Sequence, residues 1–304
     1  MSVGHVTRTL IDESRGGRQL TVEVWYPAAR AGTSPTRYEL LPGIAFDSPA
    51  ATEAAPPAPG RCPLVVWSHG RTGLRHNYTM LCEGLSRRGF VVVSADHPGD
   101  TLFDWLTGDN VDDETNERQR LGDVSYLINV MTNGFDATVP PSMIDPKAIF
   151  VGGHSYGGLT ALVTAAGIHD VEADSRVRAI AGAQAYTRTL GADVIDRIRV
   201  PALLLVGLGD RTTPPSTDAE PVWSRLQSRD SRHRRVDLPD GGHQACSDFA
   251  FYMEMLPSIP DVPRLVVDYL DSIAAESPAG YRDTWRATLE MQTGAIADFF
   301  TEHR

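Results

Sequence analysis

The chain has 304 residues, of which 41% are hydrophobic and 22% charged, a composition typical of globular proteins that excludes global disorder, collagen and coiled coil. Its 28 Lys and Arg residues against 39 Asp and Glu give a net charge of −11, so we expect no nucleic-acid partner and no attraction to anionic membranes. No apolar run approaches the roughly 20 residues that span a bilayer, so no membrane span is predicted.

The first twenty residues and the cysteines predict a cytoplasmic location. The first segment contains Asp12, Glu13 and several arginines and lacks the apolar core of a signal peptide. The three cysteines, Cys62, Cys82 and Cys246, form no CxxC motif and are expected as reduced thiols. A secreted form whose signal has been removed is the alternative.

Short apolar runs alternate along the chain with amphipathic segments. Strands are predicted at 19–26, 64–67, 90–95, 148–151, 177–183, 202–206 and 234–238. Helices are predicted at 77–88, 117–131, 155–166, 217–227, 263–275 and 281–302. Continuous apolar strands separated by helices predict an α/β protein with a parallel sheet that is covered on both faces.

We expect residues 1–304 to form a single domain. Residues 48–63 are rich in Pro and Ala and predict a surface loop. This loop is not expected to be a linker, because the strand before it belongs to the same pattern as the elements after it. Residues 276–304 are predicted to form a C-terminal helical extension.

A GxSxG motif follows the strand predicted at 148–151. Gly153, Ser155 and Gly157 lie between an apolar strand and an amphipathic helix, where a nucleophile elbow requires them. The turn is too tight for side chains two residues on either side of the serine. It also places the hydroxyl near a helix N-terminus, where developing negative charge is favoured. Ser155 is therefore the predicted nucleophile, and the alternative is a glycine-rich turn with a serine cap.

A serine hydroxyl needs a base, and His243 is the best placed of the nine histidines. It follows the last predicted core strand, and in parallel sheets ligands bind at the carboxyl ends of the strands. Gly241 and Gly242 precede it and let the loop turn the imidazole back over the sheet. His154 lies inside the elbow and is expected to point away from Ser155.

The base needs an acid that fixes its tautomer, and Asp210 is the predicted acid. It lies at the carboxyl end of the strand predicted at 202–206. The chain order of serine, aspartate and histidine matches that of hydrolases built on this elbow. The alternatives are an aspartate that only shapes a turn, or a rival acid: Asp193, Asp237 or Asp240.

Two backbone N–H groups are expected to bind the oxyanion. One belongs to Tyr156, directly after the nucleophile, and the other to Arg71, in the loop after the strand predicted at 64–67. Gly70 and Gly73 in that loop let the backbone approach a ligand closely. A plain flexible loop is the alternative. The sequence holds no HExxH motif, P-loop or GxGxxG, so neither a metal nor a cofactor is predicted.

These motifs resemble those of the α/β-hydrolase superfamily, in the branch of platelet-activating factor acetylhydrolases, dienelactone-hydrolase-like proteins and cutinases. The similar stretches are Val22–Ala28, Val65–Gly70, Ser94–Thr101, Gly152–Gly158 and Val200–Pro215. The resemblance implies a mostly parallel eight-stranded sheet with helices on both faces. Little or no cap is expected, because the one gap that could hold a cap, 101–117, is short. His69, His97, Phe103 and Trp105 are expected around the substrate pocket.

The resemblance implies a serine hydrolase that cleaves carboxylic esters of small molecules through an acyl-enzyme on Ser155. Dienelactone hydrolases use a cysteine nucleophile, so the serine favours ordinary esters. In animal platelet-activating factor acetylhydrolases the acid follows the sixth strand. Here that stretch, Ala181–Tyr186, has no acid, which favours Asp210. A lactonase, an amide hydrolase or an acyltransferase with the same residues is the alternative, followed by a non-catalytic binding module. A small ester or lactone is the expected partner, and the chain is expected to be a monomer or homodimer.

Overall fold

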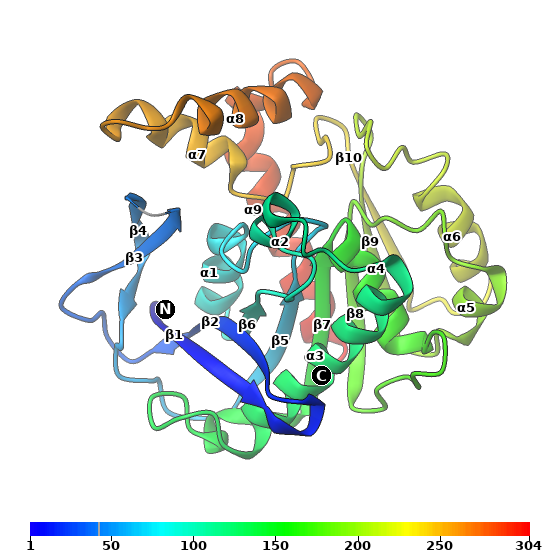
Figure 1. Cartoon of the computed structure of the whole chain (residues 1–304). Coiled ribbons are helices and arrows are strands. Elements are labelled where there is room, and N and C mark those ends of the chain that lie inside the picture. Colours follow the sequence, from blue (N-terminus) through cyan, green and yellow to red (C-terminus); the bar gives the residue numbers. More distant parts are fainter. Residues whose placement is uncertain (42) are drawn as a thin grey trace.

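The structure is a computed structural model that describes residues 1–41 and 43–304 (Figure 1). In these ranges ten strands form one sheet. The strands are β1 (Ser2–Asp12), β2 (Arg18–Ala28), β3 (Pro35–Leu41), β4 (Ile44–Glu53), β5 (Cys62–Ser68), β6 (Val91–Ala95), β7 (Ile144–His154), β8 (Val177–Ala183), β9 (Ala202–Gly207) and β10 (Arg234–Leu238). The helices are α1 (Thr79–Arg87), α2 (Leu102–Thr107), α3 (Asp113–Asn133), α4 (Tyr156–Ala166), α5 (Ala192–Arg197), α6 (Ala219–Leu226), α7 (Phe249–Met255), α8 (Arg264–Glu276) and α9 (Tyr281–Glu302).

The sheet is mostly parallel, in the strand order β10-β9-β8-β7-β5-β6-β2-β1-β4-β3. Strands β10 to β6 of this order run parallel, whereas β2 pairs antiparallel with both β6 and β1. From β5 the chain first adds β6 on one side and then returns to add β7 on the other. The order therefore reverses at β5 and β7, and in open α/β sheets ligands bind at the carboxyl ends of the strands at this point.

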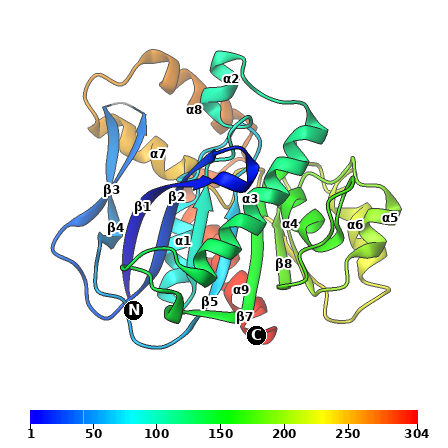
Figure 2. The ribbon, with the colours of Figure 1, turned by 60° about the horizontal axis from the view of Figure 1, so that its bottom comes forward.

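Alternate side chains of the central strands feed two hydrophobic cores, one on each face. Val66 and Val151 face a core that α3, α4, α5 and α6 complete. Val65 and Phe150 face the other core, which α1 and α9 cover. Figures 1 and 2 show these two helix layers on opposite sides of the strands. Buried parallel strands need helices on both faces, and this sheet has them. The predicted α/β class is therefore confirmed.

The C-terminal segment predicted as an extension contributes to the second core. The ring of Phe300 on α9 stacks on that of Phe150 on β7, with centroids 4.6 Å apart and planes 7° apart. Trp285, at the other end of the helix, is also buried. The helix therefore forms a layer of the fold, and its bounds are those predicted from the sequence.

The sheet has ten strands where eight were expected, because β3 and β4 extend it beyond β1. The prediction of a surface loop over 48–63 is wrong at both ends, and its last two residues, 62–63, begin β5. Residues 48–53 belong to β4, which pairs in parallel with β1, and Ala51 is buried there. The Ser48 hydroxyl is buried as well and donates to Glu83 on α1 at 2.6 Å. No helix in the described part of the chain is long and apolar enough to cross a bilayer.

Candidate active site

The predicted nucleophile lies in the turn between β7 and α4. Ser155 has φ +53° and ψ −116°, a backbone conformation that residues other than glycine rarely adopt. Such a conformation is strained and persists only where the surrounding structure supports it. That support comes from hydrogen bonds on both sides of the residue. Its N–H donates to the Ala183 carbonyl of β8 at 3.0 Å, and its carbonyl accepts from Gly158 and Tyr186, each at 2.9 Å.

Neighbouring backbone leaves room only for glycine at both glycine positions of the motif. A Cβ on Gly157 would lie 2.0 Å from the Ser68 carbonyl oxygen at the end of β5. A Cβ on Gly153 would lie 2.3 Å from the Gly157 carbonyl oxygen. The elbow is therefore pressed against the end of β5, as its sequence pattern predicts.

Three predicted residues meet at the carboxyl edge of the sheet. His243 Nε2 lies 3.0 Å from Ser155 Oγ, and His243 Nδ1 lies 2.9 Å from Asp210 Oδ2. Asp210 follows β9 and His243 follows β10, so the loops after parallel strands bring them together. Two rival acids form ion pairs elsewhere, Asp193 with an arginine of its own helix and Asp237 with an arginine of its own strand.

The carboxyl group of Asp210 is held by the turn that follows it. Its Oδ1 accepts from the N–H groups of Thr212 and Thr213, at 2.9 and 2.8 Å. Its Oδ2 accepts from the Thr213 hydroxyl at 2.6 Å. Burial by itself would raise the pKa of Asp210, but the hydrogen bond and charge of His243 and the Thr213 donors lower it below its usual value. The group is therefore an oriented carboxylate facing His243 Nδ1.

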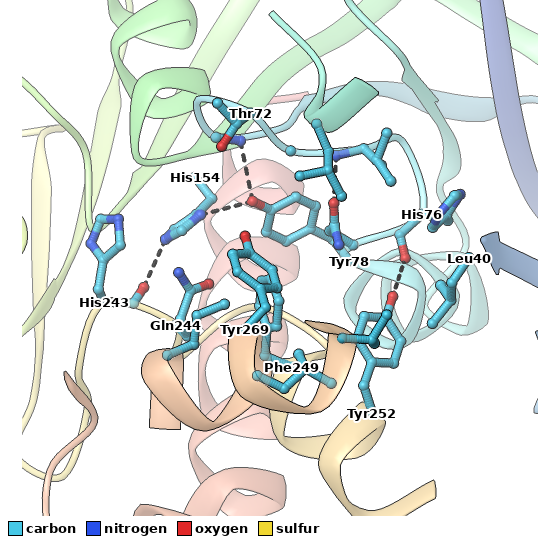
Figure 3. A pocket seen from close by; sticks show the side chains of 18 of the residues that line it. Leu40, Thr72, His76, Tyr78, His154, His243, Gln244, Phe249, Tyr252 and Tyr269 are labelled. Carbon is cyan, nitrogen blue, oxygen red and sulfur yellow. Dashed lines mark hydrogen bonds between the residues drawn. The ribbon is translucent and has the colours of Figure 1, made fainter. Parts of the chain in front are cut away.

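His154 joins two segments of the site, those of Tyr78 and His243 (Figure 3). Its Nε2 lies 2.7 Å from the backbone carbonyl of His243, and its Nδ1 lies 2.8 Å from the Tyr78 hydroxyl. A carbonyl only accepts, so Nε2 carries the proton and Nδ1 accepts from the tyrosine. Burial and the neighbouring His243 lower the pKa of His154 to about 3, so its ring stays neutral. No sequence signal pointed to Tyr78.

Both predicted oxyanion donors come from residues beside the nucleophile. Tyr156 is the first residue of α4, directly after Ser155. Arg71 follows Gly70, on which a Cβ would lie 3.4 Å from the Cβ of Ser155. That these two N–H groups bind an oxyanion stays a prediction.

The Arg71 side chain is held beside the site. Its Nη2 lies 2.6 Å from Asp113 Oδ1, and its guanidinium lies 4.2 Å from the centre of the Tyr156 ring. We expect Arg71→Ala to keep kcat/KM for neutral esters within a few-fold, because truncation leaves the backbone donor and an exposed ion pair contributes little. If the substrate is anionic, its KM alone rises about tenfold or more.

Steady-state kinetics with matched neutral and carboxylate-bearing esters check this prediction. Asp113→Ala, which removes only the partner of Arg71, is the control and leaves neutral esters unaffected. A hundredfold loss on neutral esters in folded Arg71→Ala would contradict the backbone role.

A cavity of about 290 Å³ opens beside Ser155 and His243. Two apolar walls enclose it. The first comes from β3 and β4, with Leu40, Ile44 and Phe46. The second comes from α7, α8 and the short helix between them: Phe249, Tyr252, Met255, Leu256, Ile259, Val266, Tyr269, Leu270 and Ile273. Figure 3 shows Tyr269, Phe249 and Tyr252 rising toward the cavity from these helices.

The expectation of little or no cap is therefore wrong. Residues 249–276 cover the carboxyl edge of the sheet and form a cap, which Figure 1 shows above the strands. The chain just before the cap is fixed to α1. Asp248 accepts from the N–H and hydroxyl groups of Thr79 and, at 3.2 Å, from the N–H of Met80.

The four residues expected around the pocket do not line the cavity. Phe103 and Trp105 on α2 are 44% and 58% exposed, and their neighbour Leu102 faces the cavity instead. His69, in the loop that follows β5, and His97, after β6, are fully buried and are absent from the lining of the cavity. Position after a strand shows that a residue lies near the site, but does not show which way its side chain points. Among the described residues no group of three metal-ligating side chains comes together.

A comparison with solved structures identifies the fold. The chain superposes on the structure of a ferulic acid esterase from Streptomyces cinnamoneus with a TM-score of 0.71 and 23% sequence identity, over 99% of this chain and 90% of that one. At this identity the likeness shows the fold, which is the α/β-hydrolase fold. Residues 44–122 also match the family model of platelet-activating factor acetylhydrolase, isoform II. The resemblance to platelet-activating factor acetylhydrolases inferred from the sequence is thereby confirmed over this segment.

Proposed function

We propose that this chain hydrolyses carboxylic esters of small molecules through an acyl-enzyme on Ser155. The hydrogen-bonded series from Asp210 through His243 to Ser155, at the mouth of an apolar cavity, carries the proposal. The family match over 44–122 and the esterase with the same fold support it. A serine in such a series is activated because the imidazole can take its proton as the oxygen attacks.

The reaction proceeds in two half-reactions. Ser155 Oγ attacks the acyl carbon while His243 Nε2 takes the hydroxyl proton, and the Arg71 and Tyr156 N–H groups bind the oxyanion. The Asp210 carboxylate stabilises the imidazolium. His243 then gives its proton to the alcohol oxygen as the ester C–O bond breaks. Water attacks the acyl-enzyme in the same way, and the acid and free serine are released.

The cavity favours esters with one apolar group of moderate size. Its volume is close to the lower limit of about 300 Å³ for sites that bind drug-sized ligands. Its walls are aliphatic and aromatic, and each methylene buried there contributes about 0.8 kcal/mol. We therefore expect kcat/KM to rise with the length of the apolar group until the cavity is full.

A panel of nitrophenyl esters from acetate to dodecanoate, with benzoate and a hydroxycinnamate, tests the proposed function. The expected result is hydrolysis with an optimum at intermediate acyl length. Adding alcohols, amines and lactones separates hydrolysis from acyl transfer and from lactone cleavage. If the folded chain cleaves no ester of the panel, the proposal is wrong.

Filling the cavity should narrow the range of substrates. Val266 on α8 lines the cavity, whereas its neighbour Leu265 is 73% exposed. We expect Val266→Trp to lower kcat/KM for hexanoate at least about tenfold, the loss of roughly two buried methylenes, with acetate within twofold. Leu265→Trp places the same side chain outside and leaves both esters unchanged. Equal effects of the two variants on hexanoate would contradict this placement of the cap.

A further inference from the structure

We propose that Arg120 is a positioning residue that orients the Arg71 N–H for oxyanion binding. This inference rests on the proposed function and assigns a role to a residue outside the series of Asp210, His243 and Ser155. Arg120 lies on α3, and its guanidinium is completely buried. It does not line the cavity, whereas residues 70–73 do. The loop of residues 68–73, here called the oxyanion loop, therefore lies between the guanidinium and the cavity.

The guanidinium donates to consecutive residues of the oxyanion loop. Arg120 Nη1 lies 3.0 Å from Ser68 Oγ and 2.7 Å from the His69 carbonyl oxygen. Arg120 Nη2 lies 3.3 Å from the Gly70 carbonyl oxygen. It also lies 2.8 Å from Asp100 Oδ2. A planar fork with several fixed donors can fix the direction of a backbone segment in a way that a point charge cannot.

Asp100 extends this hold to the far end of the loop. Its second oxygen, Oδ1, accepts from the Thr72 N–H at 3.3 Å. Thr72 has a φ of +55°, a conformation that a threonine adopts only under constraint. The ion pair of Arg120 and Asp100 thus binds the oxyanion loop before and after Arg71.

The Gly70 carbonyl is fixed by three donors. Besides Arg120, they are the Gly73 N–H at 3.1 Å and His69 Nδ1 at 2.7 Å. The His69 ring accepts the His97 N–H at its Nε2, at 3.1 Å, so its proton lies on Nδ1 and points at the carbonyl. Burial and the charge of Arg120 keep the pKa of His69 well below its usual value, so the ring is neutral.

This arrangement determines where the Arg71 N–H points. In a trans peptide the C=O of one residue and the N–H of the next point in opposite directions, and no cis bond occurs in the described residues. With the Gly70 oxygen directed at Arg120 and His69, the Arg71 N–H is directed away from them. A donor held in this way needs no reorganisation as the oxyanion forms, which is the condition for strong stabilisation of the transition state.

A purely stabilising role explains the buried pair less well. Removing two charges from water is costly, and apolar residues of the same volume are often as stabilising as a buried ion pair. A role in orienting the loop predicts a different signature. Loss of the guanidinium should affect kcat and leave substrate binding largely intact.

The test uses the double variant Arg120→Met/Asp100→Asn, which leaves no unpaired buried charge. Removing an oxyanion donor outright lowers kcat about 10²–10³-fold. A misaligned donor should therefore lower kcat about 10–100-fold with KM within threefold. Affinity for an alkyl boronic acid, which places an oxyanion in the site, should fall by a similar factor. Affinity for the product alcohol should stay unchanged.

Arg176→Met is the matched control. Arg176 also joins α3 to a neighbouring loop, through Ser125 and Asp174, and it does not contact the oxyanion loop. We expect its kcat and boronic acid affinity to equal those of the parent chain. Arg120→Lys, which keeps the charge without the fork, should show an intermediate kcat.

Normal kcat and boronic acid affinity in a folded double variant overturn the inference. If the double variant does not fold, Arg120→Lys decides, and an unchanged kcat in this variant overturns the inference. Failure of the proposed function looks different, because the parent chain itself would then cleave no ester, or Ser155→Ala would remain active.

Discussion

Ser155→Ala is expected to lower kcat for ester hydrolysis by about 10⁶-fold, the loss measured for the nucleophile of another serine hydrolase. Without the hydroxyl, His243 has no proton to take and no acyl-enzyme forms. The residual rate then reflects only substrate binding and the oxyanion donors. Folding should be unaffected, because the Ser155 hydroxyl interacts with His243, and the backbone bonds that fix the turn remain.

Two measurements check this result. Stopped-flow kinetics with a nitrophenyl ester should show a burst of one nitrophenol per parent chain and no burst for the variant. A fluorophosphonate should modify the parent chain once, and peptide mass spectrometry should place the adduct on Ser155. Ser86→Ala is the control, because it removes a buried hydroxyl of α1 that has no hydrogen-bond partner among the described residues. A burst from Ser155→Ala, or an adduct on another residue, would rule out the proposed mechanism.

Asp210→Asn is expected to lower kcat by about 10⁴-fold, as for the corresponding change in the serine proteases. An amide in place of the carboxylate can present N–H to His243 Nδ1. The Nε2 atom would then carry the proton and face Ser155 as a donor, which cannot take the hydroxyl proton. The lowered pKa of Asp210 means that the native group stays ionised well into the acid range, so neutral pH is suitable for the comparison.

The control is the same substitution in a surface aspartate. Asp193→Asn changes an exposed carboxylate that pairs with Arg197, and kcat should not change. Thermal unfolding of both variants separates a loss of chemistry from a loss of structure. Near-normal turnover by folded Asp210→Asn would show that another group orients the base.

The α/β class and the meeting of Ser155, Asp210 and His243 could be predicted because both depend on local signals. Runs of Val, Ile and Leu mark buried strands, and residues directly after parallel strands share one edge of the sheet. β4 was not predicted, because it depends on contacts with residues distant in the chain rather than on a local signal. Its residues include Pro and Ala, and it is held by pairing with β1 and by the buried contact of Ser48 with Glu83. Neither contact has a signature in the sequence.

The pocket could not be predicted, since its walls come from segments distant in the chain. The pattern over 263–275 indicated a helix, but it did not show that Val266 and Tyr269 would line the cavity beside Ser155. The aromatic residues Phe103 and Trp105 were expected around the pocket, but on α2 their side chains are exposed to solvent. Arg120 was not singled out, because apolar periodicity identifies the buried face of α3 without showing that a charge on that face finds a partner.

The attachment of Asp248 to α1 has a consequence for the cap. Residues 244–248 connect the base to the first cap helix, and their last side chain is fixed at the N-terminus of α1. His154 fixes the other end of this connection through the His243 carbonyl. We therefore expect a displacement of α7 and α8 to end at Asp248 and to leave the distance between the His243 imidazole and the Ser155 hydroxyl unchanged. On the proposed function, the cap would then be free to change in sequence, length or openness, and with it the choice of substrate, without moving the His243 base.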